Sequence, residues 1–285
     1  MRLSVDFLKY HGCGNDFVIV DELDGEVIPE RFKLKFAKVV CQRHFSVGAD
    51  DVLDLVSFSG VDAFMRVLEP DGTETDMCGS GIRCAASYLS EKLEKHEVVI
   101  ATRAGIRRVE KVGDLFRVKM GVLKKSFGEL KRFLNLDFSD EEELLDLQMD
   151  FPVLGRLRVS IVDTGIPHLV TFVDDVDAVN LELYGLWISK NKEIFPYGIC
   201  VDVVEVLSGD SIKVRTYERG VWSETLACGT GSTASAAVAF LLGRVKSSEV
   251  NVLLHGGKLK IIVGSPLYML GPAEKVFSGN ISLEL

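Results

Sequence analysis

The octapeptide E-T-D-M-C-G-S-G at residues 74–81 occurs again at residues 224–231 as E-T-L-A-C-G-T-G, and this internal repeat is the main indication of how the chain folds. A second pair of similar segments, V-D-E-L-D at 20–24 and V-D-D-V-D at 173–177, occurs in the same order. The two copies lie 150 and 153 residues apart, which is too far for a solenoid repeat. Two anchors in one order at nearly equal offsets predict a duplicated domain.

Segments rich in Val, Ile and Phe recur between Gly and Asp residues, and this pattern predicts strands. The predicted strands are Phe17–Val20, Phe64–Val67, Val98–Ala101, Phe116–Met120, Leu169–Val173, Val201–Leu207, Ile212–Tyr217, Val250–Leu254 and Leu259–Val263. Short turn sequences at 113–114, 208–210 and 256–257 predict hairpins, so we expect a mostly antiparallel sheet.

A helix is predicted after each copy of the octapeptide. Apolar residues between Ile82 and Leu93 recur at helical spacing, and residues 233–242 are small or apolar on every side. A helix that is apolar all round must be buried, so the second one should be wrapped by sheet. The acidic segment Glu141–Leu147 is a third predicted helix.

The composition excludes several classes of protein. The chain has 285 residues, with 33 Lys and Arg against 42 Asp and Glu, and a net charge of −9 argues against nucleic-acid binding. No apolar run reaches the roughly 18–20 residues of a membrane span, and Asp6 and Lys9 interrupt the stretch that a signal peptide would need. We therefore expect a cytoplasmic protein with no membrane partner. Six cysteines without a C-x-x-C pair predict neither a disulfide framework nor a structural zinc site.

Each repeated cysteine, Cys78 and Cys228, precedes a Gly-rich turn that leads into a predicted helix. Unpaired backbone N–H groups and the helix dipole favour a thiolate and bind an anion there. A buried structural role is the alternative, and we favour it for Cys13, Cys41 and Cys84. Two thiols on opposite sides of one ligand suit inversion at a carbon acid, because one removes a proton from one face while the other returns a proton to the opposite face.

Three stretches carry a resemblance to a known family: H-G-C-G-N-D-F at 11–17, residues 71–84, and E-R-G at 218–220 followed by A-C-G-T-G at 227–231. In this order they resemble the diaminopimelate epimerases over nearly the whole chain. The resemblance implies an α/β (α+β) fold with two pseudo-symmetric domains, each a mostly antiparallel curled sheet around a central helix. The expected domains are residues 1–121 with a C-terminal strand at about 274–285, and residues 122–273.

The resemblance also implies a cofactor-independent amino-acid epimerase or racemase, without pyridoxal phosphate or metal. Carried over by position, Cys78 and Cys228 are the acid–base pair, and His168 and Glu218 tune the pKa of the thiols. The residues assigned to substrate binding are Asn15, Asp51, Glu69, Gly79, Ser80, Ile166, Cys200, Glu218, Arg219, Gly229 and Thr230. Simpler alternatives exist, because Asn15 could cap a turn and His168 could be a hydrogen-bonded core histidine.

The chain departs from the family pattern where Glu69, Ile166 and Cys200 replace asparagines that hold the distal end of diaminopimelate. A carboxylate there attracts a distal cation, which favours a basic or neutral amino acid such as lysine. The alternatives are an authentic diaminopimelate epimerase, with Trp222 and Ser223 supplying replacement contacts, and a catalytically silent amino-acid-binding protein. The expected partner is a small amino acid, and a homodimer is the assembly we consider.

Overall fold

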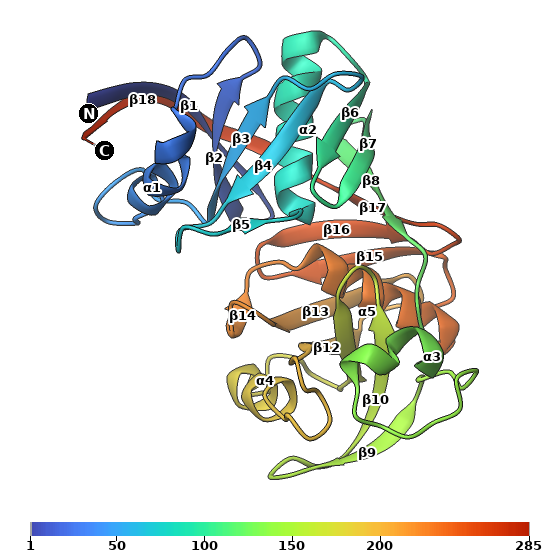
Figure 1. Cartoon of the computed structure of the whole chain (residues 1–285). Coiled ribbons are helices and arrows are strands. Elements are labelled where there is room, and N and C mark those ends of the chain that lie inside the picture. The colour runs from blue at the N-terminus through green and yellow to red at the C-terminus, as the bar shows by residue number, and fades with distance from the viewer. Residues whose placement is uncertain (1, 285) are drawn as a thin grey trace. The chain divides into compact units, whose positions relative to one another are not determined.

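The computed structural model describes residues 2–284, and the chain divides into two compact units (Figure 1). Unit 1 consists of Met1–Val118 and Gly271–Leu285, and unit 2 of Lys119–Leu270. Each unit is a mixed α/β body built mostly from strands, so the predicted fold class is confirmed. Five α-helices, one short 3-10 helix and eighteen strands make up the regular structure of the described residues.

Unit 1 is built on one run of strands with a helix inside it. Its elements are β1 (Arg2–Gly12), β2 (Asn15–Glu22), α1 (Glu30–Val40), β3 (Asp51–Val56), β4 (Ala63–Leu68), β5 (Glu74–Thr75), α2 (Gly79–Leu93), β6 (Glu97–Thr102), β7 (Gly105–Val112), β8 (Leu115–Gly121) and β18 (Glu274–Glu284). Strands β18, β1 and β2 pair antiparallel, β2 and β3 pair parallel, and β3, β4 and β5 pair antiparallel. Strand β4 also pairs parallel with β6, and β6, β7 and β8 continue antiparallel.

Unit 2 repeats this arrangement. Its elements are α3 (Phe127–Leu130), the 3-10 helix Lys131–Phe133, β9 (Leu147–Phe151), β10 (Gly155–Asp163), β11 (Pro167–Phe172), α4 (Leu181–Ser189), β12 (Cys200–Val206), β13 (Ser211–Glu218), β14 (Ser223–Thr225), α5 (Gly229–Leu241), β15 (Glu249–Leu254), β16 (Gly257–Ile262) and β17 (Leu267–Gly271). The series β10, β11, β12, β13 and β14 has the same strand directions as β1 to β5. Strand β13 pairs parallel with β15, as β4 does with β6.

Strand register gives the residue equivalence between the units. Leu53 pairs with Val67, and Asp202 pairs with Thr216, at the same positions relative to the two motifs. By the same register Phe17, paired with Asp51, corresponds to His168, paired with Cys200. The offset between β2 and β11 is therefore 151 residues. The second sequence anchor, with an offset of 153, is shifted by two residues from this structural equivalence.

A largely buried helix lies among the strands of each unit (Figure 1). Residues 80–87 of α2 and residues 231–239 of α5 are buried, and α5 has only small or apolar side chains at those positions. Small side chains let the strands approach the α5 backbone from every direction. The predicted central helix wrapped by sheet is confirmed in both units.

Each strand predicted from the sequence overlaps an observed strand, although those predicted to end at Val173, Leu207 and Val263 run one residue too far. The acidic helix predicted at Glu141–Leu147 is wrong. That segment forms a turn, an isolated bridge from Glu143 to Ser126 and a bend, and Leu144 is fully buried. Its backbone N–H donates to the carbonyl of Lys125 at 2.8 Å, and its carbonyl accepts from Ile161 at 2.7 Å. Hydrogen bonds to two neighbouring segments thus satisfy the Leu144 backbone N–H and C=O groups, which would have found partners within the segment had it been a helix.

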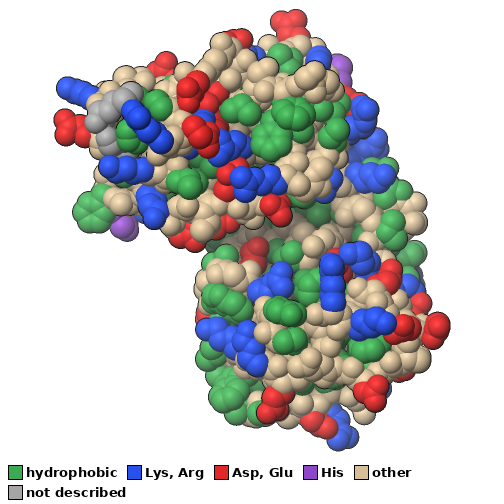
Figure 2. Space-filling model, in the orientation of Figure 1, with side chains coloured by type: hydrophobic (Ala, Val, Ile, Leu, Met, Phe, Trp, Pro, Cys, Tyr) green, Lys and Arg blue, Asp and Glu red, His purple; other side chains and the backbone are tan. Residues whose placement is uncertain are grey.

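Within residues 2–284, no helix has the length and apolar character needed to cross a membrane. Figure 2 shows acidic and basic side chains interspersed over the visible face of each unit. The net charge of −9 is therefore distributed and does not form a single acidic field on that face.

One close approach in unit 2 gives a stability test. A Cβ on Gly185 of α4 would lie 2.0 Å from Cγ of the buried Tyr217 ring. We expect Gly185→Ala to lower the free energy of unfolding by about 1–3 kcal/mol, because overpacking outweighs the roughly 1 kcal/mol gain in helix propensity. Urea unfolding followed by circular dichroism measures the change. The control is Gly209→Ala, where the nearest atom lies at 3.9 Å, and equal midpoints for both variants would contradict the expectation.

Candidate active site

Each octapeptide forms the N-terminus of a central helix with a cysteine at the N-cap. The Cys78 sulfur accepts a hydrogen bond from the Gly81 N–H at 3.4 Å, and the Cys228 sulfur accepts one from the Gly231 N–H at 3.4 Å. Both cysteines have extended backbone, with φ and ψ of −127° and 124° and of −122° and 115°. The two thiols therefore occupy equivalent positions in a field that favours negative charge.

An arginine on a neighbouring strand holds the glutamate of each motif. Arg66 on β4 donates two hydrogen bonds to Glu74, at 2.9 and 3.1 Å. Arg215 on β13 donates two to Glu224, at 2.8 and 2.6 Å. Bidentate pairing of planar groups fixes orientation as well as distance. The short strand before each cysteine is therefore tied to the sheet at the same point.

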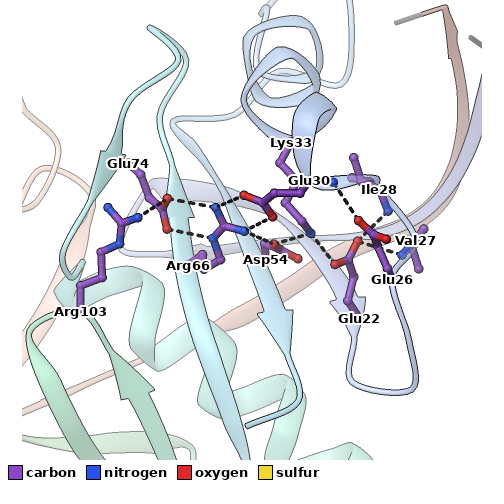
Figure 3. Close-up of polar contacts among 10 residues, drawn as sticks. All are labelled: Glu22, Glu26, Val27, Ile28, Glu30, Lys33, Asp54, Arg66, Glu74 and Arg103. Carbon is purple, nitrogen blue, oxygen red and sulfur yellow. Dashed lines mark hydrogen bonds and ion pairs between the residues drawn. The ribbon is translucent and has the colours of Figure 1, made fainter.

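In unit 1 this anchor continues into an ionic network that is exposed at Glu30 and buried at Lys33 (Figure 3). Arg66 also donates to Glu30 at the start of α1, at 2.7 and 2.9 Å, and lies between that residue and the motif glutamate. Lys33 of α1 lies between Glu22 and Asp54, with 2.7 Å to the Asp54 carboxylate. Burial raises the pKa of Asp54 to about 6, against the opposing effect of the Lys33 ammonium. The network holds α1 against the strands that support the Cys78 turn.

Cys78 has a polar neighbour, and two acidic residues of the predicted site lie elsewhere on the strands of unit 1. The Asn15 amide, at the start of β2, donates to the Cys78 sulfur at 3.8 Å. Asp51 begins β3, and Glu69 follows β4 directly. Burial raises the pKa of Asp51 to about 7, and the negative charge of Glu69 raises it further. Unit 1 thus carries a carboxyl group whose charge changes near neutral pH.

In unit 2 a chain of hydrogen bonds leads away from the thiol. The Cys228 sulfur lies 3.3 Å from the Thr230 hydroxyl, which lies 3.0 Å from Nε2 of His168. Nδ1 of the same imidazole lies 2.7 Å from Oδ2 of Asp202, and the Thr216 hydroxyl donates to Oδ1 at 2.6 Å. The imidazole and the carboxylate are fully buried. His168 is therefore a buried, hydrogen-bonded histidine of the core, and it is also linked to the Cys228 thiol through the Thr230 hydroxyl.

The corresponding positions of unit 1 are apolar. By strand register, the residues of unit 1 that correspond to His168, Asp202 and Thr216 of unit 2 are Phe17, Leu53 and Val67, respectively. The same neighbours surround the third motif glycine, because a Cβ on Gly81 would meet Leu53 and Phe17, and one on Gly231 would meet the unit 2 aspartate at 2.5 Å. The two half-sites thus share a backbone and differ in the polarity beneath the helix N-terminus.

Three further predicted residues lie on β12 and at the end of β13. Burial raises the pKa of Glu218, and hydrogen bonds with Thr225 and Cys228 act in the opposite direction. The Arg219 backbone N–H donates to the Cys200 sulfur at 3.4 Å. Cys200 is fully buried and burial raises the pKa of its thiol, so its side chain belongs to the interior of the sheet.

The turn that follows Arg219 packs against its own unit. Trp222 has a φ of 59°, and its N–H donates to the Glu218 carbonyl at 2.8 Å. Its ring lies 5.3 Å from the Lys190 ammonium and covers Gly198, where a Cβ would come within 2.8 Å of it. Ser223 pairs with Glu218 in the β13–β14 ladder. Intramolecular packing therefore fixes the conformation of this turn.

The predicted site residues divide between the units. Those in unit 1 are Asn15, Asp51, Glu69, Cys78, Gly79 and Ser80, and those in unit 2 are Ile166, His168, Cys200, Glu218, Arg219, Cys228, Gly229 and Thr230. Asp202 and Thr216 were not predicted. The available signal was an aspartate within the apolar run Val201–Val206, two positions after Cys200 and so on the same face of the strand. In the described part of the chain, no group of three or more His, Cys, Asp or Glu residues is suited to a metal ion.

The family profile "Diaminopimelate epimerase" matches residues 7–125 and 160–276. A diaminopimelate epimerase of Methanocella arvoryzae is 41% identical over 293 residues, covering 99% of this chain and 98% of the relative. A phenazine biosynthesis protein of the PhzF family from Bacillus anthracis has a TM-score of 0.70 at 18% identity, covering 99% of both chains.

A hydroxyproline epimerase from Agrobacterium vitis, solved with trans-4-hydroxy-L-proline, has a TM-score of 0.69 at 16% identity and covers 99% of this chain and 94% of its own. At these identities the solved structures establish the two-domain fold alone. The family follows from the profile, which matches most of the chain, and from the Methanocella relative, which aligns over nearly its whole length. On these grounds the chain belongs to the diaminopimelate epimerase family of amino-acid isomerases.

Proposed function

We propose that this protein interconverts stereoisomers of diaminopimelate, with Cys78 and Cys228 as the two groups that exchange a proton with the α-carbon. The observation that carries the proposal is the equivalence of the two thiols, each at the N-cap of a central helix and each accepting an N–H from a glycine three residues later. A thiolate accepts the proton on one face and a thiol donates on the other. The same pair serves both directions.

The helix N-termini also account for recognition of an amino acid. The first-turn N–H groups at Gly79, Ser80, Gly229 and Thr230 have no partner within their helices and suit a carboxylate. Charge on that carboxylate is retained throughout inversion, so these contacts bind and orient. The acceleration must come from the thiols and from groups that stabilise the α-carbanion.

The names of the relatives favour diaminopimelate over the lysine-like substrate expected from the sequence alone. Diaminopimelate carries both an ammonium and a carboxylate at its distal end. Asp51 and Glu69 together suit that ammonium, because the charge of one already raises the pKa of the other. The Arg219 guanidinium suits the distal carboxylate. The replacement of asparagines is therefore compatible with the family substrate.

Either single variant, Cys78→Ser or Cys228→Ser, should lower epimerisation by a factor of about 1,000 or more, since a hydroxyl is a far weaker base than a thiolate. The measurement is deuterium incorporation at the α-carbon from heavy water, followed separately from LL- and meso-diaminopimelate. Cys84→Ser, at a buried cysteine of α2 outside the proposed pair, is the matched control and should keep activity. Wild-type turnover in both directions for either variant would refute the two-base proposal.

Substrate preference is tested with LL-diaminopimelate and L-lysine on one preparation. We expect kcat/KM to favour diaminopimelate by about a hundredfold or more, because lysine leaves the groups for the distal carboxylate unpaired. Glu69→Gln should lower kcat/KM for diaminopimelate about tenfold, mainly through KM. The control is Asp71→Asn, an exposed acid on the same turn that should change neither constant. Faster turnover of lysine by the wild type would restore the lysine hypothesis.

Asp51 gives a pH-dependent stability test. Its pKa in the folded protein, about 7, lies above the ordinary value of 3.8, so the ionised carboxylate destabilises the fold at higher pH. We expect Asp51→Asn to raise the free energy of unfolding by about 1 kcal/mol or more near pH 8, a gain that fades as the pH falls towards about 4. Urea midpoints across this range measure it. A pH-independent gain would show that Asp51 is not the titrating group.

A further inference from the structure

The short turn between β13 and β14 carries the cation proposed to bind the distal carboxylate. Arg219 directly follows Glu218, the last residue of β13, and its backbone N–H donates to the Cys200 sulfur at 3.4 Å. Burial raises the pKa of the Cys200 thiol, and the Arg219 charge acts in the opposite direction, so the guanidinium lies near the start of β12. Among the described residues, no carboxylate forms an ion pair with this guanidinium. It is therefore available to an anion.

Trp222 closes this turn in a conformation that its side chain does not favour. Its φ of 59° lies in the left-handed region, where a residue with a large side chain is uncommon. Its N–H donates to the Glu218 carbonyl, four residues earlier, at 2.8 Å. A backbone of this kind persists only where the surrounding contacts stabilise it. We therefore looked for those contacts around the indole.

The indole packs on the segment that leads into β12. A Cβ on Gly198 would lie 2.8 Å from Cη2 of the indole and 3.1 Å from the Ser189 carbonyl oxygen, so this glycine leaves the space that the ring fills. The Lys190 ammonium, just after α4, lies 5.3 Å from the ring centroid. The ring also packs against the hydrophobic core of unit 2. The indole thus joins the turn to the end of α4 and to the residues that precede Cys200.

We propose that Trp222 is a positioning residue for substrate specificity, which holds residues 219–222 in place and so orients the Arg219 guanidinium toward the distal carboxylate of the substrate. The inference rests on the proposed function, in which Arg219 binds that carboxylate. Two contacts define the turn, the N–H bond to the Cys200 sulfur at its start and the packed indole at its end. Trp222 therefore acts through Arg219 and does not itself replace a lost asparagine.

The chemistry of carboxylate recognition explains why the turn has to be fixed. A guanidinium binds a carboxylate through two parallel N–H bonds, which depend on orientation as well as on distance. An arginine on a mobile turn would have to be ordered on binding, and that entropic cost would weaken the complex. A turn already held by the indole avoids most of this cost. The gain is confined to substrates with a distal carboxylate, because other groups hold the α-carboxylate and the α-carbon.

Trp222→Gly tests the proposal, because glycine accepts a φ of 59° and the substitution removes only the indole. We expect kcat/KM for LL-diaminopimelate to fall about tenfold or more, mainly through KM, while α-proton exchange of L-lysine in heavy water stays within about twofold. Trp222→Phe, which keeps an aromatic ring over Gly198, should restore most of the preference. The matched control is Trp187→Ala, at the other tryptophan of the chain, which lies on α4 and should change neither rate. Equal losses for both substrates would overturn the proposal, since they would show general damage to unit 2.

A second measurement does not depend on turnover. Hydrogen–deuterium exchange of the full-length protein without substrate, followed by mass spectrometry, reports on the Arg219 and Trp222 amides. We expect Trp222→Gly to accelerate exchange in the peptide of residues 218–223 by about tenfold or more, while α5 exchanges as in the wild type. Unchanged exchange in that peptide would also overturn the proposal. If the wild type failed to epimerise diaminopimelate while the variant exchanged faster, the proposed function would be refuted and the role of Trp222 in fixing the turn supported.

Discussion

The active-site geometry depends on a cysteine sulfur that accepts the N–H of a glycine three residues later at the start of a buried helix. Gly81 and Gly231 fill this role. A Cβ on Gly231 would lie 2.5 Å from the Asp202 carboxylate, and one on Gly81 would lie 3.0 Å from the Leu53 side chain. The helix must begin there, since the sulfur caps the N–H that would otherwise be unsatisfied. The hydrogen bond from the glycine N–H to the sulfur therefore fixes where the thiol lies and where the helix begins, and the absent Cβ lets the strands pass close to the helix N-terminus.

Duplication preserved this backbone arrangement while the side chains beneath it diverged. The bidentate pairs of Arg66 with Glu74 and of Arg215 with Glu224 recur at the same register, which shows that anchoring the motif strand is common to both units. The layer under the helix differs, being apolar in unit 1 and an ionisable network in unit 2. A duplicated scaffold can thus hold two thiols in the same local backbone geometry and still surround them with different side chains.

The sequence predicted most of the fold because its signals are local. Alternating apolar runs, Gly-Asp turns and the repeated octapeptide mark the strands, hairpins and central helices without reference to distant residues. The acidic helix failed because Glu141–Leu147 has helical composition, but its Leu144 backbone pairs with segments about twenty residues away on either side. The offset of 153 residues for the second sequence anchor was also inexact. Residues 173–177 form a loop after β11 and resemble the end of β2 in composition, whereas strand pairing makes His168 the equivalent of Phe17, an offset of 151 residues.

The candidate site was predictable where a motif carries it and not where tertiary contact creates it. Cys78, Cys228 and the glycines that follow are visible as letters in the repeat, whereas Asp202 is one acid in an apolar strand. Such an acid is rarely buried unless something pairs with it, and its partner, His168, lies 34 residues away. An acid within an apolar strand is therefore a weak sequence signal for a buried polar contact. The pairing of β12 with β11 identifies the contact, because it brings Asp202 next to His168. The repeated motif locates the two thiols in the sequence, whereas the residues beneath them differ between the units and are brought together only by the pairing of the strands.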